Sequence, residues 1–228
     1  MGRTMSDAVD HSMRRVLDRE LAEARELSLR MGEFVEDAID AAVEALVGGD
    51  AARCEAVIAG DTELNALQLR MRELAVVTIV TQAPVDGDLR RMLAYLHMSA
   101  ELERMGDHCV SIAKIGRELC DPRPAGGLRD LVRMSELCGI QLHEMLEAVV
   151  EGDVEGARIV ASHDDRVDRI YRRLFDEQVR ASAAGEESAA TATRLTLVAH
   201  HLERIADRVT NMGEDLVYLQ TGIVEELG

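Results

Sequence analysis

The same helical phrase occurs twice in this chain, at positions one hundred residues apart. Leu102–Asp107 reads Leu-Glu-Arg-Met-Gly-Asp, and Leu202–Asp207 reads Leu-Glu-Arg-Ile-Ala-Asp. Earlier in the chain, Val43–Asp50 matches Leu146–Asp153 at a spacing of 103 residues. A repeat of this length has the size of a small domain and is too long for the unit of a solenoid. The leading interpretation is therefore two tandem copies of one domain.

The composition predicts an all-α fold. Aromatic residues make up 2% of the 228 residues, Trp does not occur, and Ala, Leu, Val, Glu and Arg dominate. Such a composition is poor for strands and good for helices. The three prolines, at positions 84, 122 and 124, all lie outside the stretches with apolar periodicity. With 47% apolar residues, the chain also has enough apolar side chains to build a core.

Apolar periodicity and turn signals divide the chain into six long helices. They are expected at about residues 7–47, 50–81, 89–119, 128–150, 153–183 and 186–218. The segment 122–127 contains two prolines and two glycines, so it cannot continue a helix. We take it as the linker between a first domain of residues 1–121 and a second domain of residues 128–228. Each domain is predicted to be a three-helix bundle, and the two bundles are related by internal duplication.

The formal net charge of −17 argues against nucleic acid or an anionic membrane surface as a direct partner. Both attract basic residues, and the chain as a whole lacks a basic stripe. No secretory or membrane-spanning segment is recognisable, and the four cysteines form no Cys-x-x-Cys pair. We therefore expect a cytoplasmic protein with reduced, mostly buried cysteines, which meets a membrane only through its partners.

Each copy of the repeated phrase places a Glu and an Asp on one helix face, four residues apart. These are Glu103 and Asp107 in the first copy, and Glu203 and Asp207 in the second. A helix turns by about 100° per residue, so both pairs are displaced by roughly 100 to 150° from the centre of the apolar stripe. The carboxylates are predicted to lie on the flank of each bundle, within reach of water.

Two further polar pairs are expected on the helices that run antiparallel beside these flanks. Asp61 and Asn65 form one pair, and Asp164 and Asp168 form its equivalent in the second half. Facing carboxylates repel one another unless a cation lies between them. Ligation by oxygen alone favours hard or borderline ions, so the pattern predicts sites for divalent or trivalent Mg, Mn, Fe or Zn ions.

The competing interpretation is an ordinary solvated face. Asp and Glu fill 43 of 228 positions, so acidic pairs at this spacing often arise by chance. Repetition at equivalent places favours the metal interpretation. Asn211, one turn beyond Asp207, is a further candidate oxygen ligand, whereas His200 faces the same side but has no His counterpart in the first half. Gly106 and Ala206 hold equivalent places beside the apolar stripe, which predicts close helix approach there.

The catalytic motifs that are recognisable from sequence are missing. There is no Gly-rich phosphate loop, no Ser or Cys with a recognisable base, no His-Glu-x-x-His motif and no Glu-x-x-His pair of the di-iron type. We therefore expect that the protein is not an enzyme.

The chain resembles the PhoU family of phosphate-signalling proteins over essentially its whole length. The resemblance is carried by the phrases that begin at Leu102 and Leu202, which match the family pattern Leu-Glu-Arg-Ile-(Gly/Ala)-Asp-x-x-x-Asn, and by the segments around Asp61 and Asp164–Asp168. It implies two tandem three-helix bundles, with multinuclear metal clusters on the bundle surface in some members. Carried over position by position, the implied ligands are Glu103, Asp107 and Asp61 in the first half, and Glu203, Asp207, Asp164 and Asp168 in the second.

The first half departs from the family pattern at two positions. Asn65 stands where an Asp is expected, and Ser111 stands where an Asn is expected. The first site is therefore expected to hold metal more weakly than the second, or not at all.

The resemblance also implies a function. PhoU-like proteins are negative regulators that act between the high-affinity phosphate ABC transporter and a sensor histidine kinase, and dimers occur among them. For this chain the resemblance implies a cytoplasmic adaptor whose partners are the ATPase subunit of the transporter and the kinase, in the form of a homodimer. Two alternatives remain open at the level of sequence: a metal-storage or redox bundle, and an acidic helical scaffold without any ligand.

Overall fold

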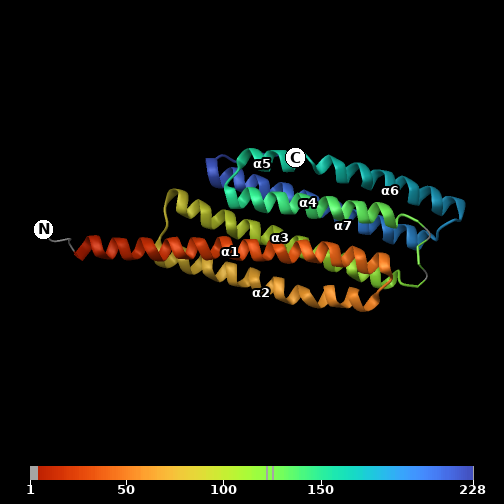
Figure 1. Cartoon of the computed structure of the whole chain (residues 1–228), viewed down its shortest axis with the longest axis horizontal. Helices are drawn as coiled ribbons and strands as arrows, with labels where there is room; N and C mark the ends of the chain where they lie inside the picture. Colours follow the sequence, from red (N-terminus) through yellow and green to blue (C-terminus); the bar gives the residue numbers. More distant parts are fainter. Residues whose placement is uncertain (1–4, 122, 125, 228) are drawn as a thin grey trace.

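The structure, a computed structural model, describes residues 5–121, 123–124 and 126–227, with side chains from residue 14 onward except at position 164. The described residues form helices and no strand, which confirms the all-α prediction (Figure 1). The helices are α1 (Met5–Gly48), α2 (Ala51–Gln82), α3 (Asp86–Glu118), α4 (Leu128–Glu151), α5 (Val154–Ala161), α6 (Asp164–Ala184) and α7 (Ala189–Thr221).

The helices assemble into two bundles that lie side by side along their length (Figure 1). Helices α1, α2 and α3 pack on one another, and α4, the α5–α6 rod and α7 form the second group. Between the groups, α3 lies against α7 and α1 lies against α4. The predicted architecture of two three-helix bundles is confirmed. The chain passes from one bundle to the other between α3 and α4, where residues 122 and 125 of the expected linker lie outside the described residues.

The turns after α1 and α4 are equivalent in the duplication and have the same local chemistry. Gly49 and Gly152 both adopt left-handed backbone angles, with φ of 66° and 70°. The backbone N–H of the following residue, Asp50 or Asp153, donates to a carbonyl five residues back at 2.9 Å. The side chain of each Asp then accepts a hydrogen bond at 3.0 Å from the backbone N–H three residues on. The glycine ends one helix and the aspartate caps the next, as the sequence predicts.

The fifth of the six expected long helices is interrupted once. It stops after Ala161 and resumes at Asp164, so it comprises the two segments α5 and α6. At the break, the His163 N–H donates to a carbonyl three residues back at 2.9 Å, and the Ser162 hydroxyl donates to another at 2.6 Å. A serine hydroxyl competes with the backbone for such carbonyls, and the tighter turn interrupts the α-helical bonding. Both residues keep right-handed angles, so α5 and α6 continue as one broken rod (Figure 1).

One hydrophobic core runs through both bundles. The apolar series that predicts the first helix is buried along most of its length, and the stripes of α3 and α7 are buried with it. The fully buried members of those two stripes include Leu102, Met105, Ile112, Leu202 and Ile205. Burial of such side chains contributes about 1.5–3 kcal/mol each relative to exposure, so this shared core is the main source of stability.

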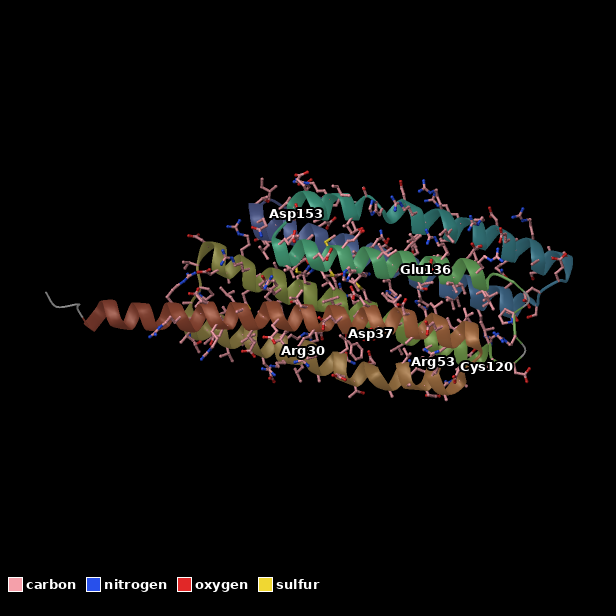
Figure 2. The ribbon with its side chains drawn as sticks, viewed as in Figure 1. Arg30, Asp37, Arg53, Cys120, Glu136 and Asp153 are labelled. Carbon is pink, nitrogen blue, oxygen red and sulfur yellow. The ribbon has the colours of Figure 1, made fainter. Side chains whose placement is uncertain are left out.

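The outer faces of the bundles carry the charge. Figure 2 shows Arg30, Asp37 and Glu136 projecting from α1 and α4, and all three are exposed. Within the part of the chain that the structure describes, none of the helices combines the length and the apolar character needed to cross a membrane.

Candidate functional site

The first group of candidate carboxylates gathers between α2 and α3. Burial, and after it the charge of Asp107, raises the pKa of Glu103, and Asp61 adds to this effect. Burial and the charge of Asp61 likewise raise the pKa of Asp107. The three side chains therefore act on one another across the two helices. Asp61 Oδ1 is buried and has no hydrogen-bond partner among the described residues. We call Asp61, Glu103 and Asp107 the first carboxylate cluster.

Gly106 brings α2 and α3 close together at this cluster. A Cβ atom on Gly106 would overlap Cδ2 of Leu64, and Asp61 Oδ1 lies 3.9 Å from the same point. The close helix approach predicted at Gly106 is confirmed, and it is what places a carboxylate of α2 beside the motif of α3. Ala206, at the equivalent place in α7, is fully buried.

The second carboxylate cluster, which we define as Asp168, Glu203 and Asp207, lies between α6 and α7. Burial is the largest cause of the raised pKa of Glu203, followed by the charge of Asp207. Burial and the charge of Asp168 raise the pKa of Asp207, while Arg204 lowers it. Glu203 Oε2 is buried without a hydrogen-bond partner in the described chain; His200 Nδ1 lies 3.2 Å away but outside hydrogen-bonding geometry.

Arginines balance part of the charge of the second cluster. Arg172 Nη2 lies 2.9 Å from Asp168 Oδ2, and Arg204 Nη1 lies 2.7 Å from Asp207 Oδ2. Both pairs join residues of one helix, at i,i+4 and i,i+3 spacing. These arginines therefore compensate carboxylate charge within their own helices.

Three of the remaining candidate residues donate hydrogen bonds to carboxylate or carbonyl oxygens. The side chain of Asp164 lies outside the described residues. Asn65 Nδ2 donates to Asp61 Oδ2 at 2.7 Å, and the Ser111 hydroxyl donates to the carbonyl of Asp107 at 2.9 Å. The amide of Asn211 donates to Glu101 Oε2 on α3 at 3.0 Å, so its nitrogen is engaged outside the second cluster.

The two clusters supply the right donors for a hard cation in an open arrangement. Among the described side chains, no group of three or more His, Cys, Asp or Glu residues is gathered tightly enough to hold a metal ion as it stands. Each cluster nevertheless presents mutually repelling carboxylates and one buried oxygen without a partner. Unpaired buried oxygens and raised carboxyl pKa values are what a bound cation relieves. The donor chemistry fits, although these side chains do not form a closed coordination shell.

One family of protein domains matches this chain twice, once in each half. The model of the PhoU domain matches residues 28–116 and, a second time, residues 131–216. The chain belongs to the PhoU family.

Similar proteins cover the chain almost from end to end. The phosphate-specific transport system accessory protein PhoU homolog of Clostridium acetobutylicum is 30% identical over 210 residues, which is 92% of this chain and 96% of the relative. Its namesake from Caulobacter vibrioides is 34% identical, covering 91% of this chain and 90% of the relative.

Solved structures agree with the fold. The crystal structure of PhoU from Pseudomonas aeruginosa has a TM-score of 0.86 at 26% identity, and it covers 90% of this chain and 99% of its own. The phosphate transport system regulatory protein PhoU from Streptococcus pneumoniae has a TM-score of 0.82 at 30% identity, with coverage of 92% and 100%.

The interface between the two PhoU repeats contains a buried charge that the sequence reasoning missed. Glu101 on α3 is 1% exposed and accepts hydrogen bonds from Arg104 on its own helix and from two residues of α7. Arg208 Nη1 donates to Glu101 Oε2 at 3.2 Å, and Asn211 donates to the same oxygen at 3.0 Å. The sequence does contain an indication of this buried charge, because Glu101 lies one turn before Met105 on the apolar face of the helix.

A second polar contact of the PhoU repeats is related to the first by the duplication. At the spacing of one hundred residues, Glu101 corresponds to His201 and Arg208 corresponds to His108. His108 and His201 meet across α3 and α7, with their Nδ1 atoms 3.1 Å apart. Burial, together with His201 and Arg208, lowers the pKa of His108 to about 4. At neutral pH one ring therefore donates to the other. Of these two equivalent places in the interface, one has an ion pair and the other has a neutral histidine pair.

Proposed function

We propose that this protein is a cytoplasmic negative regulator of phosphate uptake and of phosphate-starvation signalling. It acts as an adaptor between the ATPase subunit of a phosphate ABC transporter and a sensor histidine kinase, without catalysing a reaction itself. The observation that carries the proposal is the match of both repeats to the PhoU domain, together with near-complete coverage of relatives named for a role in phosphate transport. The rigid, acidic outer faces of the bundles suit docking to basic surfaces on other proteins.

The decisive experiment compares phosphate uptake and a phosphate-starvation reporter in a deletion strain grown with abundant phosphate. Deletion is expected to leave both uptake and reporter output high, and the intact gene supplied on a plasmid is expected to restore repression. Normal repression in the deletion strain would overturn the assignment. Co-purification of the tagged protein with the ATPase subunit and with the kinase tests the adaptor role separately. Light scattering of the pure protein tests the proposed homodimer.

The carboxylate clusters are proposed to hold divalent or trivalent metal ions that stabilise the bundles and support docking. Iron, zinc, manganese and magnesium all suit oxygen donors of this kind. Asp61, Glu103 and Asp107 would hold the ion in the first half, and Asp168, Glu203 and Asp207 in the second. A weaker first site is favoured because an Asn amide occupies one oxygen of Asp61 and the Ser111 hydroxyl bonds to the backbone.

Metal addition is expected to raise the melting temperature of the metal-free protein. Raised carboxyl pKa values mean that the native state binds protons more readily than the unfolded state, so stability without metal falls as pH rises through those values. A cation at a hundred times its dissociation constant contributes about 2.7 kcal/mol, which corresponds to several degrees in a chain of this length. Calorimetry at neutral pH with Mn²⁺, Zn²⁺ or Fe²⁺ measures the shift.

Single-residue variants test whether the rise in melting temperature comes from metal bound at the carboxylate clusters. Asp207→Ala is expected to lose most of the bound metal, whereas Asp107→Ala retains most of it, as measured by elemental analysis. Glu55→Gln, which changes an exposed carboxylate paired with Arg117, serves as the control. The opposite ranking of the two aspartates would refute the asymmetry. Oxidation of Fe²⁺ by the purified protein would favour the metal-storage or redox alternative.

A further inference from the structure

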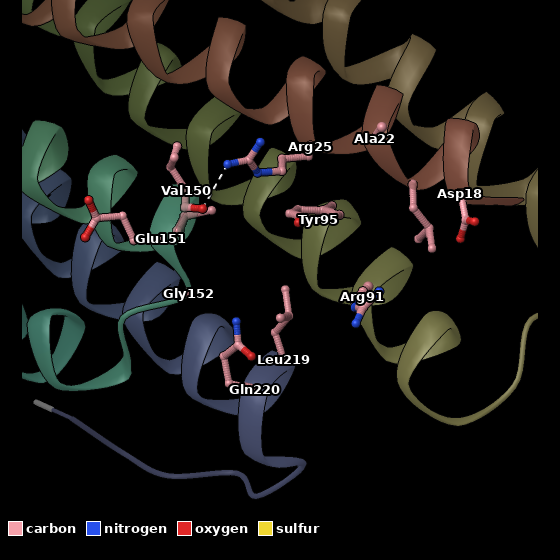
Figure 3. A pocket seen from close by; sticks show the side chains of 12 residues that line it. Asp18, Ala22, Arg25, Arg91, Tyr95, Val150, Glu151, Gly152, Leu219 and Gln220 are labelled. Carbon is pink, nitrogen blue, oxygen red and sulfur yellow. Dashed lines mark hydrogen bonds between the residues drawn. The ribbon is translucent and has the colours of Figure 1, made fainter. Parts of the chain in front are cut away.

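A cavity of about 350 Å³ opens where the two bundles meet, and no member of either carboxylate cluster lines it. Its walls come from α1 and α3 of the first repeat, and from α7 and the end of α4 in the second (Figure 3). Arg25, Arg91 and Tyr95 line it from the first repeat, and Val150 and Gln220 line it from the second. Because both repeats contribute, a ligand held here would contact both bundles at once.

The hydroxyl of Tyr95 is the first sign of a binding site. Tyr95 is 7% exposed and lines the cavity, yet its hydroxyl makes no hydrogen bond to any residue that the structure describes. The residue is buried as a whole, while its oxygen is accessible from the cavity, so this hydroxyl can bond to a ligand or to water there.

Two guanidinium groups flank this phenol (Figure 3). Arg25 donates to the carbonyl of Val150 at 2.8 Å and has no carboxylate partner among the described residues. Arg91 reaches Asp88 only at 3.5 Å, and Asp88 is also paired with Arg14. Burial raises the pKa of Tyr95, while Arg25 and Arg91 both act to lower it, so both cations lie close enough to influence the phenol.

The acidic residues of the cavity wall leave this cation pair available. Asp18 is paired with Arg14, with Asp18 Oδ1 2.9 Å from Arg14 Nε. Glu151 is exposed, and Figure 3 shows its carboxylate turned away from Tyr95. The amide of Gln220 adds a neutral hydrogen-bonding group from α7.

We propose that this junction cavity binds a small oxyanion of the phosphate class, held by the guanidinium groups of Arg25 and Arg91 and by the hydroxyl of Tyr95. Guanidinium groups form charge-assisted and often bidentate hydrogen bonds with phosphate oxygens, and a phenol donates one more. The cavity lies at the small end of the range for ligand sites, which suits inorganic phosphate or the phosphate group of a small phosphomonoester. The proposal rests on the cavity and not on the regulatory function proposed above.

Isothermal titration of the full chain tests this site. The protein is titrated with inorganic phosphate and, in a separate arm, with glycerol phosphate, at constant ionic strength and with a chelator present so that phosphate held by metal is not counted. Saturable binding with one site per chain is expected in at least one arm, and the tighter ligand identifies the source of the oxyanion. Arg91→Gln is expected to weaken binding at least tenfold, and Tyr95→Phe by about threefold.

The matched control is Arg70→Gln, since Arg70 is an exposed arginine paired with Glu23 at 2.6 Å and lies outside this cavity. It is expected to bind as the unaltered chain does, and thermal melts show whether each variant is folded. The absence of saturable binding up to about 10 mM in both arms would overturn the proposal. Binding that both Arg91→Gln and Tyr95→Phe leave unchanged would overturn it too. Neither result bears on the deletion strain, so failure here and failure of the regulatory assignment are separate outcomes.

Discussion

Replacing Glu101 by alanine is expected to lower the free energy of unfolding by about 3 kcal/mol, or roughly 6 to 12 °C in melting temperature. Glu101 is 1% exposed, and its carboxylate accepts hydrogen bonds from Arg104, Arg208 and Asn211. Removing it leaves the Arg208 guanidinium, which is 19% exposed, without its counter-charge inside the interface between the bundles. An uncompensated buried charge is costly because it has lost water and gained no partner. Urea denaturation followed by circular dichroism measures the loss.

A matched exposed pair on the same two helices provides the control. Arg194 Nε on α7 lies 2.8 Å from Glu118 Oε2 on α3, and the side chains are 38% and 54% exposed. Glu118→Ala is expected to cost less than about 1 kcal/mol, because water screens the pair and solvates the remaining charge. A double-mutant cycle between Glu101→Ala and Arg208→Ala is expected to show strong coupling. Equal costs for the two glutamates, or additive effects in the cycle, would contradict the assigned role of Glu101.

Replacing Gly116 by valine is expected to destabilise the first bundle by about 3 kcal/mol. An added Cβ on Gly116 would lie 3.0 Å from Leu46 Cβ, 3.2 Å from Cys54 Sγ and 3.3 Å from Leu46 Cα. One of these atoms belongs to the backbone of α1, so the clash cannot be relieved by side-chain rotation alone. The β-branched side chain of valine adds two further carbons where the Cβ alone is already too close to its neighbours, so α1 and α3 must move apart. Chemical denaturation of the purified variant measures the effect.

Gly139, in the middle of α4, is the comparison that separates packing from helix propensity. A Cβ added there meets no atom within 4 Å. Gly139→Ala is therefore expected to stabilise the protein by up to about 1 kcal/mol, because alanine loses less backbone entropy in a helix than glycine does. Gly116→Ala gains the same propensity but meets the clash, so its effect is expected to be unfavourable. If both alanine variants stabilise the protein, α1 and α3 do not meet as closely as described.

Much of the architecture could be predicted because its causes are local. The repeated phrase, the left-handed glycines and the capping aspartates act within a few residues, so Gly49–Asp50 and Gly152–Asp153 could be recognised as equivalent turns from the chain alone. The break at Ser162 escaped prediction because the apolar stripe continues through it. Apolar periodicity predicts which face of a helix is buried. It does not predict where a serine hydroxyl donates a hydrogen bond to a backbone carbonyl and interrupts the helix.

The clusters were predictable in part. Spacing along one helix places Glu103 with Asp107, and Glu203 with Asp207. That Asp61 joins the first pair depends on the missing side chain of Gly106, which the sequence indicates only as a small residue. Asn211 shows what spacing along one helix leaves open. It lies one turn beyond Asp207 on the same helix, yet its amide nitrogen bonds to Glu101 on the other repeat.

What the sequence alone determines is the duplication, the helices and the flank on which each acidic pair lies, because these follow from composition and from spacing along one helix. Only the tertiary structure decides how the two bundles are set against each other. That packing places Glu101 opposite Arg208, His108 opposite His201, and Arg25 with Tyr95 around one cavity. The partners in these contacts are between 70 and 107 positions apart in the chain, and which of them meet depends on the fit of two apolar faces to each other. No pattern within a single helix carries that information.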